Sequence, residues 1–204
     1  MKGLWCKKVG MTQLFQENGK VVPVTALAVG QWRVTQIKTD ARDGYNAVQI
    51  GLVRNQHLQA EFSAEWLLNK TKYFSVLREV PANQIEAIEL GSEIDPGSII
   101  KQGDYVHLSG KTIGRGFQGG VKRHGFAGGP GSHGGKLGRK PGSMGFMRSR
   151  GRVIKGWRMA GHMGVEQRMV RNIPVIATED NGNLLLVKGS VPGKTGSLIV
   201  LHKV

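Results

Sequence analysis

Residues 114–169 have the sequence GRGFQGGVKRHGFAGGPGSHGGKLGRKPGSMGFMRSRGRVIKGWRMAGHMGVEQRM, and this stretch determines how the rest of the chain has to be organised. Gly-Gly and Pro-Gly pairs recur along it, and both favour turns and irregular backbone over helices and strands. Residues 111–171 hold 17 of the 31 glycines of the chain. Because its apolar content is low, such a segment cannot bury a core of its own. We therefore predict one long, irregular loop at 114–169 that becomes ordered on a binding partner.

Charge is concentrated in the same stretch. Residues 111–171 contain 14 of the 29 lysines and arginines but only one of the 14 acidic residues, Glu166, so they carry +13 of the formal net charge of +15. The two flanks, 1–110 and 172–204, are each close to neutral. A segment so rich in cations repels itself, and a polyanion neutralises that repulsion. The charge distribution indicates that the loop binds nucleic acid.

The flanks show the pattern of a small β-barrel. Short apolar runs are separated by turn signals such as Asn18-Gly19, Asp43-Gly44 and Asn181-Gly182. Many short strands with regularly spaced turns are typical of barrels. The expected strands are 11–15, 21–29, 33–37, 47–52, 105–113, 173–177, 183–187 and 197–201.

Residues 56–97 differ from this pattern. EFSAEWLLN at 61–69 and PANQIEAIEL at 81–90 favour short helices, with Pro81 in a first turn and Gly91 as a stop signal. Residues 74–80 between them favour a strand. The predicted fold is therefore mainly β. A β-barrel is built from 1–55, 98–113 and 170–204, an α+β insert occupies 56–97, and an extended RNA-binding loop occupies 114–169.

Cysteine content and hydropathy restrict the compartment. Cys6 is the only cysteine, which excludes an internal disulfide and fits a reducing environment. No window of 18 apolar residues is present, so no transmembrane helix is expected. The first residues also lack the apolar stretch of a signal peptide.

Two glycine-containing motifs resemble nucleotide sites but fail in their context. Gly114–Gly119 matches G-x-G-x-x-G, but a dinucleotide site also needs a following helix and an acid about twenty residues on. We expect no helix there, and the next acid is Glu166. Gly-Lys-Thr triplets at 110–112 and 193–195 lack the earlier glycine of a P-loop, so they are interpreted as turns.

The remaining polar residues form no recognisable catalytic or metal site. His124, His133 and His162 share the loop with no cysteine and one carboxylate, whereas a zinc site needs four suitable ligands. No Ser-His-Asp, Cys-His or paired-carboxylate arrangement can be assembled. We predict no catalytic residue, no metal, no cofactor and no small-molecule substrate.

The cations of the loop are the candidate nucleic-acid ligands. Arginine contacts phosphates in a bidentate manner and stacks on bases. Phenylalanines and Trp157 are interleaved with these cations, which suits unpaired bases better than a regular duplex and favours RNA over DNA. Packing of Trp157 against the loop's own backbone is an equal alternative. The candidate phosphate ligands are Lys122, Arg123, Lys136, Arg139, Lys140, Arg148, Arg150, Arg152, Lys155 and Arg158, and the candidates for base contact are Trp157 and His162.

The sequence supports three other classes of function less well. A DNA-binding, chromosome-organising protein is the main alternative, but it needs a helix or ribbon that fits a duplex. An RNA-modifying enzyme needs a catalytic or cofactor site. A membrane-surface protein needs an amphipathic helix, which the glycines disfavour.

Several motifs in order along the chain resemble the bacterial type of the ribosomal protein L3 family, a component of the large ribosomal subunit. The resemblance covers most of the chain, and the poorly matched part is the insert around 55–97. The matching motifs are KGL at 2–4, KKVGMT at 7–12, GFQG at 116–119, VKR at 121–123, HG at 133–134, RKPGSMG at 139–145, KGWRMAGHMG at 155–164 and LLLVKGSVPG at 184–193.

This resemblance implies a translation-protein-type β-barrel with an α/β insert and a long loop. It implies binding near the 3′ end of the large ribosomal RNA, a role early in subunit assembly, and a loop that extends toward the peptidyl transferase centre. Ribosomal proteins L14 and L19 are the implied neighbours, and no enzymatic activity is implied. The implied location is the cytoplasm, although organelle ribosomes use similar proteins. Some bacterial members carry a methylated glutamine where this chain has His162.

Overall fold

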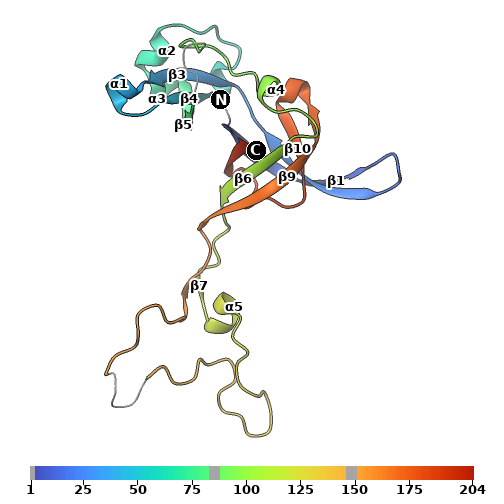
Figure 1. Ribbon diagram of the computed structural model, residues 1–204, viewed down its shortest axis with the longest axis vertical. Helices are drawn as coiled ribbons and strands as arrows, with labels where there is room; N and C mark the ends of the chain where they lie inside the picture. Colours follow the sequence, from blue (N-terminus) through green and yellow to red (C-terminus); the bar gives the residue numbers. More distant parts are fainter. Residues whose placement is uncertain (1–2, 83–87, 146–150) are drawn as a thin grey trace. The chain divides into compact units, whose positions relative to one another are not determined.

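Six antiparallel strands close into a barrel in the computed structural model, which describes residues 3–82, 88–145 and 151–204 (Figure 1). Their order around the barrel is β1-β11-β6-β9-β10-β2. Closure leaves no strand edge open, because every strand pairs on both sides. The predicted mainly β fold with a small barrel is confirmed. The strands are β1 (Gly3–Phe15), β2 (Val21–Ala28), β6 (Tyr105–Lys111), β9 (Gln167–Glu179), β10 (Leu184–Lys188) and β11 (Leu198–Lys203).

The predicted hairpin at Asn18-Gly19 joins β1 to β2. Gly19 has a φ of +75°, which a glycine adopts without strain, and the Gln16 N–H donates to the Lys20 carbonyl at 2.9 Å. The two strands then pair from Phe15 opposite Val21 down to Lys7 opposite Ala28. The turn therefore sets the register of the first barrel hairpin.

The barrel core consists of aliphatic side chains that alternate inward along each strand. Leu4, Leu27, Leu108, Leu185 and Leu201 are all fully buried in one cluster. Each buried leucine of this kind contributes ~1.5–3 kcal/mol of transfer free energy. The core thus supplies a rigid frame for the strands that lead to the loop.

A separate three-stranded sheet with the order β3-β4-β5 corrects one part of the sequence prediction. Its strands are β3 (Trp32–Lys38), β4 (Ala47–Val53) and β5 (Phe74–Pro81). The segments at 33–37 and 47–52 were expected in the barrel, but β4 pairs with β3 on one side and with β5 on the other. Its backbone groups are therefore used inside this sheet. The division of the chain into three domains stays a prediction.

The helices are shorter than predicted. In place of a helix over 61–69, the chain forms α2 (Glu65–Leu68) and α3 (Lys70–Tyr73), separated at Asn69 by non-helical dihedral angles. The Trp66 ring on α2 and the Tyr73 ring on α3 stack with centroids 4.9 Å apart, so the two single turns pack against each other. Other short helices described outside 112–166 are α1 (Asp40–Asp43), α4 (Pro96–Ile99), and the 3₁₀ turns η1 (Asn55–His57) and η2 (Asp180–Gly182).

The second predicted helix, over 81–90, is wrong where the structure describes it. Pro81 is the last residue of β5, paired with Ala47, and residues 88–90 are not helical. A strand end tolerates proline, because the missing N–H breaks no interior ladder bond. Residues 83–87 of this prediction lie outside the described residues.

Residues 112–166, here called the arm, form a compact unit distinct from residues 1–111 and 167–204. The arm contains β7 (Phe117–Gln118), α5 (Gly120–His124) and β8 (Gly161–His162). Apart from these short elements, most of its described backbone is irregular, as predicted. Helix α5 corrects the expectation that no helix follows Gly119, and β9 begins at residue 167, inside the predicted loop.

No helix within the described ranges combines the length and the apolar character that crossing a membrane requires.

Candidate nucleic-acid interface

The two ends of the arm form an antiparallel ribbon. The Thr112 N–H donates to the Glu166 carbonyl at 2.9 Å, and the Arg115 N–H donates to the Met163 carbonyl at 2.8 Å. Farther along, β7 pairs with β8, with Phe117 opposite His162. The ribbon fixes the first and last residues of the arm next to each other, so a chain with few regular elements still has a defined base.

Gly164 allows this ribbon to close. Its φ is +85°, and a β-carbon at this position would lie 2.2 Å from the Ile113 carbonyl oxygen. The following Val165 also has a positive φ, of 58°, which is rare for a β-branched residue. The close approach of the two strands therefore depends on the missing side chain of Gly164.

Helix α5 ties the outgoing half of the arm to the returning half. Arg123 Nη1 donates to the Met159 carbonyl at 2.7 Å, and His124 Nε2 lies 3.0 Å from the same oxygen. Gly125, at a φ of 73°, ends the helix, and its N–H donates to the Val121 carbonyl at 3.0 Å. The guanidinium of Arg123 thus serves an internal contact and is partly buried.

A pocket of about 590 Å³ lies within the arm. Its walls come from three segments that are distant in sequence: the turn after α5, the residues around 137–144, and the returning segment at 156–158. The apolar lining includes Phe126, Leu137, Met144 and Trp157, and the cations Lys140 and Arg158 also line it. The sequence did not predict this arrangement, because the aromatic and basic residues that meet here share no periodic spacing.

The predicted phosphate ligands are mostly exposed side chains of the arm. Arg123 differs, because its guanidinium binds the Met159 carbonyl. Arg148 and Arg150 lie outside the described residues. The exposed candidates are Lys122, Lys136, Arg139, Lys140, Arg152, Lys155 and Arg158, and the exposed candidates for base contact are Trp157 and His162. The structure brings Lys140, Trp157 and Arg158 together around the pocket.

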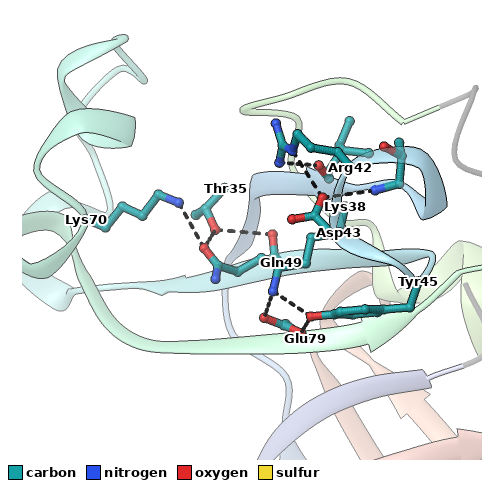
Figure 2. Close-up of polar contacts among 10 residues, drawn as sticks. Thr35, Lys38, Arg42, Asp43, Tyr45, Gln49, Lys70 and Glu79 are labelled. Atoms are coloured by element: carbon teal, nitrogen blue, oxygen red, sulfur yellow. Dashed lines mark hydrogen bonds and ion pairs between the residues drawn. The ribbon is translucent and has the colours of Figure 1, made fainter.

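In the first unit, residues 1–111 and 167–204, several cations form ion pairs with acidic side chains. Lys38 Nζ lies 2.7 Å from a Glu79 carboxylate oxygen and donates to the Tyr45 hydroxyl at 2.6 Å, as Figure 2 shows. Two hydrogen bonds lower the pKa of Glu79, and the one from Lys38 has a larger effect than the one from Tyr45. In the arm, by contrast, the sequence offers all cations a single acid, Glu166. The positive charge of the arm is therefore largely available to an external anion.

The same sheet uses a neutral side chain to hold another lysine. Lys70 Nζ donates to Gln49 Oε1 at 2.9 Å, and the Thr35 hydroxyl donates to the same oxygen at 3.0 Å (Figure 2). Partial burial lowers the pKa of Lys70. These contacts link α3 to β3 and β4.

Metal chemistry has no support in the described part of the chain. Among residues 3–82, 88–145 and 151–204, no group of three or more His, Cys, Asp or Glu side chains could hold a metal ion. His124 of the arm is engaged with the Met159 carbonyl and lies 5.8 Å, between ring centroids, from Phe126.

Comparison with known proteins gives a consistent family. The family model described as "Ribosomal protein L3" matches residues 79–183. The chain is 43% identical over 204 residues to the "Large ribosomal subunit protein uL3" of Dehalococcoides mccartyi strain BAV1, covering 100% of this chain and 98% of that protein. Proteins of the same name from Prochlorococcus marinus strain MIT 9301 and Synechococcus sp. strain CC9605 are each 44% identical, over 97% of this chain and 91% of theirs. The match over the full length confirms the resemblance noted from the motifs, and the chain belongs to the ribosomal protein L3 family.

Proposed function

We propose that this protein is a structural constituent of the large ribosomal subunit and that its arm binds the large ribosomal RNA. The observation that supports the proposal most strongly is the arm itself, in which many exposed cations share a single acid. Contacts between these cations and phosphates release condensed counterions, which gives strong binding that depends on salt. The names of the relatives, which are proteins of the large ribosomal subunit, agree with this role.

The finer proposal follows the family resemblance. The protein binds near the 3′ end of the large ribosomal RNA, helps to nucleate subunit assembly, and extends the arm toward the peptidyl transferase centre. Ribosomal proteins L14 and L19 are its proposed neighbours, and the bacterial cytoplasm is its proposed location. The role is architectural and needs no enzymatic step, because neutralising phosphates is enough to hold RNA segments that otherwise repel each other.

Neutralising cations of the arm tests the proposal. In the variant with Arg139→Gln, Arg152→Gln and Lys155→Gln, three exposed cations lose their charge. Each lost phosphate contact removes roughly 0.7–0.9 from the slope of log K against log salt, so the slope falls by about 2 to 3. The affinity of the full chain for large-subunit RNA is measured at several salt concentrations.

A matched control removes the same number of exposed charges from the first unit, through Lys20→Gln, Lys188→Gln and Lys194→Gln. This control keeps most of the slope if the arm carries the contacts. An equal loss of slope in both variants contradicts the assignment of RNA binding to the arm. Equal affinity of the wild-type protein for duplex DNA at the same salt favours the chromosome-organising alternative.

A further inference from the structure

The pocket of the arm is held by contacts that do not depend on a ligand. A β-carbon at Gly120 would lie 2.7 Å from the Phe126 ring, so this ring packs directly on the helix backbone. The Gly129 N–H donates to the Gly138 carbonyl at 2.7 Å, which positions Leu137 opposite. The contacts of α5 with the Met159 carbonyl hold the returning segment that carries Trp157.

The chemistry of the lining identifies one kind of occupant. Apolar and aromatic side chains form much of the pocket, and two cations, Lys140 and Arg158, line it as well. A volume of about 590 Å³ lies within the ~300–1,000 Å³ typical of small-molecule sites, and is therefore large enough for a nucleoside. The pocket-lining residues include no acid that would attract a cationic group.

We propose that this pocket receives a single unstacked nucleobase of the bound RNA, which stacks on Trp157 while its phosphate contacts Lys140 or Arg158. This inference rests on the proposed function and adds to it a defined site for one nucleotide. An aliphatic side chain of a neighbouring protein would use the apolar walls but leave the two cations without a partner. A phosphate alone would use the cations but leave the aromatic wall exposed. A nucleotide satisfies both.

The site predicts two separable contributions to RNA binding. Stacking on an aromatic side chain contributes ~1–3 kcal/mol per base, which corresponds to a change in affinity of roughly 5- to 150-fold. It releases no counterion, so its loss leaves the salt dependence unchanged. Loss of one phosphate contact on a single strand instead lowers the slope of log K against log salt by roughly 0.7.

The experiment uses the full chain and a short single-stranded RNA that carries one 2-aminopurine. Stacking on Trp157 quenches the fluorescence of this base. We expect Trp157→Ala to abolish the quenching and to weaken affinity by roughly 5- to 150-fold at an unchanged salt slope. Trp157→Phe keeps a stacking surface and is expected to retain most of both. The double variant Lys140→Ala and Arg158→Ala is expected to lower the salt slope by at least roughly 0.7 and to leave the quenching in place.

Phe117→Ala is the matched aromatic control. Phe117 belongs to the same arm and is 77% exposed, but it does not line the pocket. Quenching that survives Phe117→Ala and is lost in Trp157→Ala supports the site. If Trp157→Ala binds and quenches like the wild type, no base stacks in the pocket and the proposed site is wrong. If the wild-type chain shows no salt-dependent RNA binding, the proposed function itself is wrong.

Discussion

Replacement of Gly164 by alanine should open the base of the arm and weaken RNA binding without unfolding the barrel. Gly164 has a φ of +85°, and a β-carbon there would lie 2.2 Å from the Ile113 carbonyl oxygen. Contacts of a β-carbon below 3.0 Å essentially never occur, and the opposing atom is backbone, so the ribbon has to separate. Two neighbouring bonds are then at risk: Val165 N–H to the Thr112 carbonyl at 3.2 Å, and Met163 N–H to the Gly116 carbonyl at 3.0 Å.

The cost of Gly164→Ala follows from these contacts. A left-handed backbone conformation costs an L-residue ~1–2 kcal/mol. Each lost ribbon hydrogen bond adds ~0.5–1.5 kcal/mol. The total is about 2–5 kcal/mol. If the arm has to regain the ribbon when it binds RNA, this cost appears as a loss of affinity of at least about 30-fold.

Two other glycines of the arm separate the cost of the left-handed conformation from the cost of the steric clash. Gly116 has a φ of +65°, but a β-carbon added there would have no atom within 4 Å, so Gly116→Ala carries the conformational cost alone, ~1–2 kcal/mol. Gly131 has neither a positive φ nor a close neighbour and does not line the pocket, so Gly131→Ala should bind like the wild type. Affinity for large-subunit RNA is measured for the three variants at one salt concentration. Hydrogen exchange of the Val165 and Met163 amides reports whether the ribbon is open.

The salt slope should be the same in all three variants, because none of them removes a cation. The expected order of affinity, from the tightest binding to the weakest, is Gly131→Ala, then Gly116→Ala, then Gly164→Ala. Equal affinities, with the ribbon amides exchanging fast only in Gly164→Ala, would show that bound RNA does not require the closed ribbon. That result would refute the link between the backbone geometry of the arm and its function.

Three further predictions concern the first unit. Leu108→Ala should lower the free energy of unfolding by ~2–5 kcal/mol in urea titration, because Leu108 is fully buried. Leu68→Ala, at an 84% exposed position, should have little effect. Similar losses of unfolding free energy in the two variants would contradict the assignment of Leu108 to the core. Burial raises the pKa of the Cys6 thiol to about 12, so iodoacetamide at pH 8 should label Cys6 only in denaturant, and rapid labelling of the native protein would argue against its burial. Glu79→Gln should lower the Tm slightly at neutral pH, because the ion pair with Lys38 lowers the pKa of Glu79 in the folded state. This stabilisation is complete above the ordinary pKa of 4.5 and is lost as the pH falls through the lower folded value, so a Tm difference between wild type and variant that persists in acid would exclude the ion pair as its cause.

Much of the fold could be predicted from local signals. Asn18-Gly19 and Asn181-Gly182 mark turns whose backbone has positive φ, and such turns depend on a few adjacent residues. The assignment of 33–37 and 47–52 to the barrel failed because pairing partners are chosen by tertiary contacts. The apolar sequence of β4 would suit a strand of the barrel or a strand of the separate sheet. Only its pairing with β5 assigns β4 to the separate sheet. In the part of 81–90 that the structure describes, the predicted helix is wrong because proline suits a first helical turn and also the end of a strand, and Pro81 pairs with Ala47.

The candidate site also has features that the sequence could predict and features that it could not. Charge and glycine content are additive properties, so the sequence was sufficient to predict a cationic, mostly irregular loop. The separate role of Arg123 was not predictable, because its partner is a backbone carbonyl 36 residues away. The pocket around Trp157 was missed for a similar reason, since its lining residues meet only through turns at several glycines.

The pairing of β1 with β11 has a consequence for the order of folding. Cys6 and Ile199 are partners in this pair and stand 193 residues apart. The barrel therefore cannot close during synthesis until the ribosome has made β11, the last of its strands in chain order. Such non-local closure is slow, and β1 and β6 keep open edges that can pair with other chains in the meantime. The arm precedes β11 in the chain, so its cations become available to RNA while the barrel is still incomplete.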